Sequence, residues 1–432
     1  MFTDQEDLYS HIAELMLEDN IDFVACPIIS PWHAIGVDAL VYDILQRKKE
    51  KPSGVVVITP HMSPQTRPDF TISESDFMCR DFAKVRFCYL DSGSPTKELT
   101  ISRQIDLAKK AFDILVAIRE LKKTDKESKR EMRIVTALFP NVFILRAFRS
   151  KELARKYYPI FSLLDEGIAT HMPAKLWGSI DKLICQEKEP GYFQVTRFLR
   201  VKMLFNAANL IRIMGGKCLA IEKRFLSEKS HGKLVPNRRI TGLYRNMIEK
   251  RAAKYKKAGK NKPVAIIITD PLLPYDEANL AEESHFMEAV INILIDIGFA
   301  VVIKPHPTEL MNKYSHLSAE FKPEQVKIVQ KKMSAEILFS TIKPDCVIGY
   351  DSTALVNASI IYNIPAIRIT DILLSKVYYR PIKLSSEYFK RLTSLILYDA
   401  DNFEKLKQML KSIASGGAAN TKFSPPSTPL GH

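Results

Sequence analysis

The chain has 432 residues, 46% of them apolar, and its 63 Lys and Arg against 49 Asp and Glu give a net charge of +14. At about 150 residues per domain this length predicts two or three domains, and the apolar fraction excludes a chain that is disordered throughout. No apolar run approaches the ~20 residues that a membrane-spanning helix needs, so we expect a soluble or peripherally bound protein. The positive charge favours an anionic partner, which leaves nucleic acid, a membrane surface and an acidic polysaccharide open.

The amino-terminal residues and the cysteines both favour the cytoplasm. The first seven residues include three acids, where an export signal would be basic and then apolar. The six cysteines form no CxxC pair, and most lie in apolar runs. This pattern argues against a zinc cluster or a disulfide framework and favours buried thiols. We therefore expect a cytoplasmic protein, with peripheral contact to an anionic inner membrane left open.

Short apolar runs in the first half of the chain predict buried strands, because they are rich in Val, Ile and Phe and bounded by Pro, Gly, Ser or Asp. They cover residues 21–26, 54–59, 85–90, 133–138 and 159–164. Between the third and fourth runs, apolar residues recur at helical spacing with Lys and Arg in the gaps. This pattern predicts a helix over residues 105–121.

A second series of the same kind follows Lys262. Strands are predicted over residues 264–269, 299–303, 326–330, 345–349 and 365–369, with a helix over 278–297. The repeated strand–helix–strand order predicts an α/β protein with two Rossmann-like domains whose parallel sheets face a central cleft. No GxGxxG fingerprint or Walker A loop accompanies these strands. The NAD-dependent dehydrogenase and P-loop NTPase classes therefore lose their main support.

The predicted domains are separated by a strongly basic segment. We expect an N-terminal domain over residues 1–221, an interdomain segment over 222–262, a C-terminal domain over 263–414 and a disordered tail over 415–432. The interdomain segment has 14 Lys and Arg against 3 Glu, a net charge of +11. Two interpretations stay open: a solvated helix and loop, or a basic surface beside the cleft that attracts an anionic polymer or lipid headgroups.

A pair of carboxylates follows the last predicted strand of the first half, at Asp165 and Glu166 before Gly167. Side chains at the carboxyl end of a parallel strand face the crevice in which open α/β sheets bind ligands. Adjacent carboxylates repel one another, so one of them can have a raised pKa and serve as a general base. The alternative is a strand-end turn whose acids cap a helix.

A His-Pro motif ends the strand at 299–303, where Lys304 is followed by Pro305, His306 and Pro307. Two prolines fix both flanking φ angles and hold the imidazole in one direction. A cationic or hydrogen-bond-donating His suits the phosphate oxygen of a leaving group. The alternative is a rigid turn in which the His caps a neighbouring helix.

A hydroxyl pair opens a predicted helix after Gly349, where Ser352 and Thr353 follow Asp351. Such residues either cap the free N–H groups of the helix or, together with those groups, bind a phosphate.

Asp270 follows the first strand of the second half, so its loop should border a nucleotide. The alternative for Asp270 is an ordinary turn.

The order acid pair, His-Pro, Ser-Thr resembles the shared motifs of the bacterial sialyltransferases of GT-B fold, over about residues 163–358. Among them the polysialyltransferase family, which extends capsular polysialic acid, is the most similar, and the lipooligosaccharide sialyltransferase family is the near rival. Polysialyltransferases usually continue the acid motif with a Gly-Thr-Gly-like stretch, whereas here residues 168–170 are Ile, Ala and Thr.

The resemblance implies an inverting, metal-independent transfer of sialic acid from CMP-sialic acid to a hydroxyl of a bacterial surface glycan, capsular polysialic acid being one such glycan. Glu166, with Asp165 beside it, would be the general base of an acceptor-side N-terminal domain. His306 would stabilise or protonate the CMP phosphate in a C-terminal CMP-sugar domain. The expected donor-binding residues are Ser352, Thr353, Lys304, Pro307, Asp270 and Gly349, with no cofactor and no metal. The expected partners are a CMP-sugar donor and an acidic glycan or glycolipid acceptor.

Two other function classes stay open. CDP-glycerol or CDP-ribitol polymer transferases also have a Lys-x-His-Pro motif and a Ser pair, but the His-Gly-Thr-Pro-Leu-Lys-type motif of these enzymes is missing from the first half of this chain. A nucleic-acid-binding protein would explain only the charge, since the chain has no recognisable nucleic-acid-binding motif.

Overall fold

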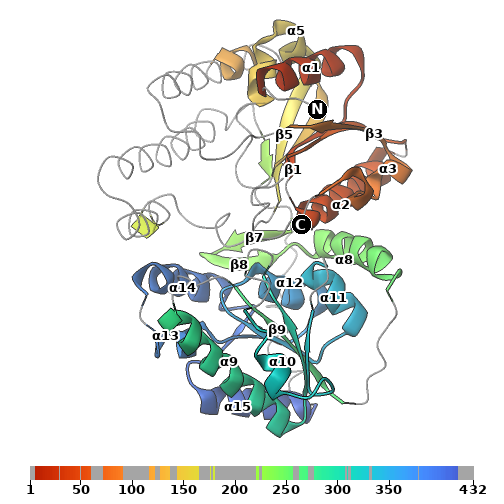
Figure 1. Ribbon diagram of the computed structural model, residues 1–432. Coiled ribbons are helices and arrows are strands. Elements are labelled where there is room, and N and C mark those ends of the chain that lie inside the picture. The colour runs from red at the N-terminus through yellow and green to blue at the C-terminus, as the bar shows by residue number, and fades with distance from the viewer. Residues whose placement is uncertain are drawn as a thin grey trace, which may run out of the picture. The chain divides into compact units, whose positions relative to one another are not determined.

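The computed structural model of the protein contains two separate six-stranded parallel sheets (Figure 1). The residues described are 5–28, 30–48, 50–59, 72–90, 116–121, 127–136, 144–164, 176, 179–180, 220–222, 226–255, 262–270, 277–306, 309, 313–329, 333–377 and 379–416. The chain divides into two compact units, Met1–Glu228 with Pro236–Met247, and Lys229–Val235 with Ile248–His432. The prediction of two Rossmann-like domains is confirmed, and the division falls inside the basic segment 222–262.

The sheet of the first unit has the strand order β3-β2-β1-β4-β5-β6. Its strands are β1 (Phe23–Ile28), β2 (Ser53–Ile58), β3 (Lys84–Tyr89), β4 (Arg130–Thr136), β5 (Tyr157–Leu163) and β6 (Ala220–Glu222). The helices are α1 (Gln5–Glu18), α2 (Pro31–Lys48), α3 (Cys79–Phe82) and α5 (Lys151–Lys156), with 3-10 turns η2 (Glu74–Asp76) and η3 (Ile144–Arg149). All five predicted strands are present. Of the helix predicted over 105–121, residues 116–121 are helical and the rest lie outside the described residues.

The sheet of the second unit repeats this order as β11-β10-β9-β12-β13-β14. Its strands are β9 (Val264–Ile268), β10 (Ala300–Lys304), β11 (Val326–Ile328), β12 (Cys346–Gly349), β13 (Ala366–Arg368) and β14 (Tyr398–Asp399). The helices are α9 (Glu277–Ile297), α10 (Leu317–Glu320), α11 (Ala335–Ile342), α12 (Thr353–Tyr362), α13 (Thr370–Leu374), α14 (Arg380–Thr393) and α15 (Phe403–Ala414). The five strands and the helix predicted here are all confirmed.

The central strands of each sheet are buried between helices, which explains why β2, β9 and β12 are almost continuously apolar. In the first unit Leu8 and Ile12 of α1 pack with Val24 and Phe161 of the sheet. In the second, α9 and α15 share a core with β9, β10 and β12. Cys26, Cys79, Cys88 and Cys346 are buried free thiols, as expected, whereas Cys185 and Cys218 lie outside the described residues.

Both sheets reverse their strand order at one point, between β1 and β4 in the first unit and between β9 and β12 in the second. Open α/β sheets bind ligands at the carboxyl ends of the strands that flank such a point. The topology therefore directs attention to the residues that follow β9 and β12.

The basic segment forms a hairpin of β7 (Ser227–Ser230) and β8 (Lys233–Pro236), followed by α8 (Arg238–Ala252). One face of α8 is apolar, and in the first unit Tyr244 of this face lies with its ring centroid 5.3 Å from that of Trp32. The exposed face is basic, with Arg238, Arg239, Arg245 and Lys250. None of the helices in the described part of the chain has both the length and the apolar character that a membrane crossing needs.

Gly349 allows β12 to lie close against β9. It is the partner of Ile268 in the parallel pairing, and a Cβ atom at this position would lie 2.6 Å from the Ile268 carbonyl oxygen. Because that oxygen belongs to the backbone of a central strand, a side chain here forces the two strands apart.

Gly349→Ala should therefore lower the free energy of unfolding by about 1–3 kcal/mol, the usual cost of overpacking a core. Urea denaturation measures this change. Gly242→Ala is the control, because a Cβ there meets no atom within 4 Å and Ala is a better helix former than Gly. A Gly349→Ala variant as stable as the unchanged protein would contradict the close approach.

Candidate functional site

The loop after β10 is held by the buried carboxylate of Glu309, which is 0% exposed. Its Oε2 atom accepts hydrogen bonds from the backbone N–H of His306, at 2.8 Å, and from the hydroxyl of Thr269 at the end of β9. Its Oε1 atom accepts from Lys313 Nζ at 2.7 Å and from the Tyr314 hydroxyl at 2.8 Å. One side chain thus ties the His-Pro loop to the neighbouring strand.

These contacts keep Glu309 ionised. Burial by itself would raise the pKa of this carboxyl, but the charge of Lys313 and the hydrogen bonds hold it below its ordinary value. Lys313 also donates to Glu283 Oε1 at 2.9 Å, and burial raises the pKa of Glu283. The loop therefore rests on a buried ion-pair cluster.

Lys304 and His306 differ in accessibility. Lys304 is only 3% exposed, and its Nζ atom donates to the Pro305 carbonyl at 2.8 Å, within the same loop. His306 is partly exposed, and its backbone N–H also lies 3.2 Å from the Thr269 hydroxyl. His306 is thus the more accessible of the two, and its backbone N–H is held by Glu309 and Thr269.

The helix α12 begins beside the point where the strand order reverses. Ser352 is its N-cap, and the Ser352 Oγ atom accepts from the backbone N–H of Ala354 at 3.3 Å. Thr353 is the first helical residue. The capping function expected for this motif is therefore present, and the first turn presents N–H groups and a positive dipole end.

A second buried ion-pair cluster surrounds Arg368 at the end of β13. The Arg368 side chain is 0% exposed. Its guanidinium donates to Asp351 at 2.6 Å, Asp371 at 2.9 Å, Asp399 at 3.1 Å and the Ser386 hydroxyl. Burial would lower the pKa of Arg368, but the carboxylates raise it, so this group stays charged. Since Asp351 follows β12, the cluster links the ends of β12 and β13.

Asp270 has the most perturbed carboxyl group of this edge. Burial, together with the charges of Glu309 and Asp351, raises the pKa of Asp270 to about 8. At neutral pH this side chain therefore carries a proton and can donate a hydrogen bond.

The structure gathers several predicted residues at one edge of the second sheet and leaves others undescribed. Those at the carboxyl ends of β9, β10 and β12 are Asp270, Lys304, His306, Gly349, Ser352 and Thr353. The predictions for Asp165, Glu166 and Pro307 lie outside the described residues. Sequence reasoning assigned no role to Glu309 or Arg368. For Glu309 the available signal was its position three residues after His306. No local sequence pattern marks Arg368.

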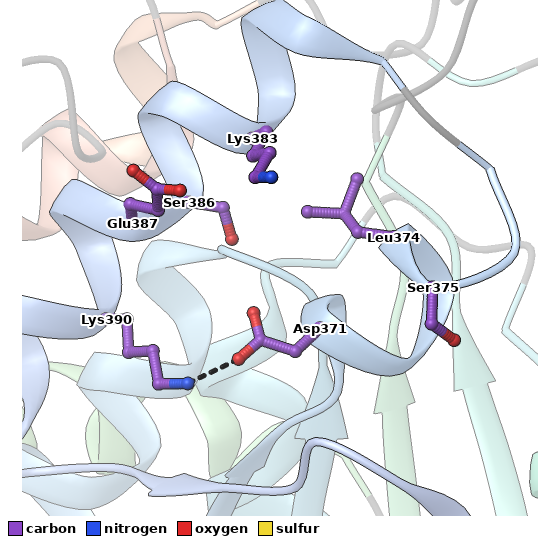
Figure 2. A pocket seen from close by; sticks show the side chains of 7 residues that line it. All are labelled: Asp371, Leu374, Ser375, Lys383, Ser386, Glu387 and Lys390. Carbon is purple, nitrogen blue, oxygen red and sulfur yellow. Dashed lines mark hydrogen bonds and ion pairs between the residues drawn. The ribbon is translucent and has the colours of Figure 1, made fainter.

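A pocket of about 390 Å³ opens beside the Arg368 cluster, between α13 and α14 (Figure 2).

As for metal ions, the described ranges contain no group of three or more His, Cys, Asp or Glu arranged to hold one. The expectation of a metal-independent protein stays a prediction.

A profile of the alpha-2,8-polysialyltransferase family (POLYST) matches residues 27–370. The chain belongs to this family. The matched range contains all three motifs and excludes the last helices, α14 and α15. As a member of the polysialyltransferase family, the protein is a glycosyltransferase. No curated protein matches the chain.

Several solved structures resemble the polysialyltransferase chain over most of its length. A sialyltransferase GT-B domain from Photobacterium damselae is 13% identical, with 88% of this chain and 99% of that chain covered and a TM-score of 0.40. UDP-GlcNAc 2-epimerase from Methanocaldococcus jannaschii is 12% identical, with 93% of each chain covered and a TM-score of 0.46. The two Rossmann-like sheets are established by the topology of the chain itself, and at these scores the two likenesses support no statement about its fold or its substrate.

Asp270→Asn should stabilise the protein most at alkaline pH. Between about pH 4 and pH 8 the folded state keeps the Asp270 proton and the unfolded chain loses it, so stability falls as the pH rises. The amide needs no proton, so the melting temperature of the variant should exceed that of the parent by several degrees at pH 8 and by less at pH 5. Thermal unfolding at several pH values measures this difference.

Asp296→Asn is the matched control, because it removes an exposed carboxyl of α9. Its melting temperature should follow that of the parent at every pH. If Asp270→Asn behaves in the same way, Asp270 is ionised at neutral pH and the assignment of its proton is wrong.

Proposed function

We propose that the protein transfers sialic acid from CMP-sialic acid to a hydroxyl of an acidic glycan or glycolipid, with inversion and without a metal ion. The observation that carries this proposal is that His306 follows β10 and the Ser352 cap of α12 follows β12, on either side of β9 at the same edge of one parallel sheet, in a chain of the polysialyltransferase family. The other two function classes draw no support from this family.

The donor phosphate is proposed to bind at the first turn of α12. Free N–H groups and the positive end of the dipole attract an anion there, and Thr353 adds a hydroxyl. The predicted contacts of Lys304, Gly349 and Pro307 belong to the same proposal, with Lys304 acting through the Pro305 carbonyl that it holds.

The imidazole of His306 is proposed to donate a hydrogen bond or a proton to the phosphate as CMP leaves. Its backbone is held by Glu309 before any substrate binds, so the reaction spends little free energy on positioning it. Asp270, protonated at neutral pH, adds a donor rather than a repelling charge. Together these groups can offset the phosphate charge that Mg²⁺ neutralises in many nucleotide-sugar enzymes.

Glu166 is proposed as the general base that removes the proton of the acceptor hydroxyl, with Asp165 beside it raising its pKa. One base and one set of phosphate-binding groups imply a single displacement at the anomeric carbon, hence inversion.

The acceptor is proposed to be anionic, which the exposed basic face of α8 supports. The same face suits an anionic membrane surface. The protein is therefore proposed to be cytoplasmic, to contact the inner membrane peripherally and to extend a capsular polymer there.

A panel of free nucleotides tests the donor class. Thermal shift with CMP, CDP, UMP and UDP should show the largest stabilisation by cytidine nucleotides, because a ligand that binds the folded state raises the melting temperature. Preference for uridine nucleotides would contradict a CMP-sugar donor.

Metal independence is tested by turnover of CMP-sialic acid with EDTA and with added Mg²⁺. Equal turnover is expected, and loss of turnover with EDTA would contradict metal independence.

Two substitutions separate the roles of the catalytic residues. Glu166→Gln should reduce turnover at least 100-fold, about the contribution of a general base, and leave CMP binding unchanged. His306→Ala should reduce both turnover and CMP affinity. His285→Ala, which removes an exposed imidazole of α9, is the control and should change neither. A fully active Glu166→Gln or His306→Ala variant refutes the corresponding assignment.

A further inference from the structure

The pocket between α13 and α14 lies wholly within the second unit, and its volume of about 390 Å³ is in the range of small-molecule sites. Its lining residues are Asp371, Leu374, Ser375, Lys383, Ser386, Glu387 and Lys390. In Figure 2 the side chains of Lys383 and Ser386 come from α14 and face that of Leu374 from the α13 side. The pocket therefore brings charged, hydroxyl and apolar groups together.

The Arg368 cluster fixes the walls of this pocket. Arg368 donates both to Asp371 Oδ1 and to the Ser386 hydroxyl. Lys390 donates to Asp371 Oδ2 (Figure 2). Both oxygens of Asp371 are thus neutralised by cations, and the pKa of Asp371 lies below its ordinary value because these contacts outweigh its burial. A carboxylate ligand would meet little repulsion from Asp371.

Two donors in the pocket suit a carboxylate. Ser386 is 1% exposed, and its oxygen accepts the bond from Arg368. A hydroxyl also has one hydrogen to donate, and among the described residues no acceptor receives the Ser386 hydrogen. Lys383, one turn earlier on the same helix, supplies an exposed ammonium group.

The charge on α14 is positive, with Arg380, Lys383, Lys390 and Arg391 against Glu387. The pocket lining itself has two of these lysines, Lys383 and Lys390, against Asp371 and Glu387. Clustered cations of this kind attract an anionic ligand. The remaining lining groups suit the other parts of a sugar: Glu387 and Ser375 can accept from hydroxyl or amide N–H groups, and Leu374 can pack against an acyl methyl group.

We propose that this pocket is a subsite for one N-acylated acidic sugar residue, whose carboxylate binds Lys383 and Ser386. The residue comes either from the donor or from the acceptor glycan, and the identity of the sugar as sialic acid rests on the proposed function. The pocket follows β13, the neighbour of β12 in the sheet, so it adjoins the strand that leads into the phosphate-binding turn of α12.

Binding of the free sugar tests the subsite without turnover. Titration of the protein with N-acetylneuraminic acid, followed by saturation-transfer NMR, should show binding that weakens about tenfold or more in Lys383→Ala, the effect of losing a hydrogen bond to a charged group. Lys376→Ala removes an exposed lysine outside the pocket and should bind as the parent does. Neutral N-acetylglucosamine should bind more weakly than the acidic sugar. Equal binding of N-acetylneuraminic acid by the parent and Lys383→Ala overturns the proposal.

Steady-state kinetics with CMP-sialic acid and an oligosialic acceptor then separate the two sources. In Lys383→Ala a raised KM for the donor alone assigns the subsite to the donor sugar, and a raised KM for the acceptor alone assigns it to the glycan. Neither KM changing overturns the proposal. If the protein does not use CMP-sialic acid at all, the proposed function fails, and the sugar-binding titration still decides the subsite.

Discussion

The carboxylate of Glu309 is the contact on which the candidate site depends. A buried ionised group is costly unless it is paired and hydrogen-bonded, and this one receives hydrogen bonds from His306, Thr269, Lys313 and Tyr314. Hydrogen bonds to a charged group are each worth about 1.5–3 kcal/mol, so the cost of burial is offset only when the whole set is formed. The backbone position of His306 and the end of β9 are therefore coupled to one another.

A second buried charge, that of Arg368, anchors the chain on the other side of the strand-order reversal. Arg368 holds Asp351, which follows β12, against the end of β13, and Thr370 donates to the same Asp351 oxygen at 2.8 Å. The groups proposed to bind phosphate thus stand on two loops, each anchored by a buried ion. Such anchoring lets a site stabilise developing charge without reorganising during the reaction.

Local patterns explain how much of the fold could be predicted. The ten predicted strands were all confirmed, and the signal is strongest in the central ones such as β2, β9 and β12, which are short apolar runs that are almost wholly buried. The strands β6 and β14, which have three and two residues, were not predicted. The N-cap at Ser352 was predictable because capping depends on neighbouring residues alone. The role of Arg368 was not, since its partners Asp351, Asp371, Ser386 and Asp399 come from four separate places in the sequence.

The sequence by itself determined the class of protein, since motif order, strand pattern and the absence of dinucleotide and P-loop fingerprints all lie within short stretches of chain. Tertiary structure decided the states of the side chains. In the sequence Asp270 is an ordinary strand-end acid, yet partial burial and the charges of Glu309 and Asp351 raise its pKa to about 8 in the folded chain. Protonation depends on distances through space, and those distances exist only once the strands have paired.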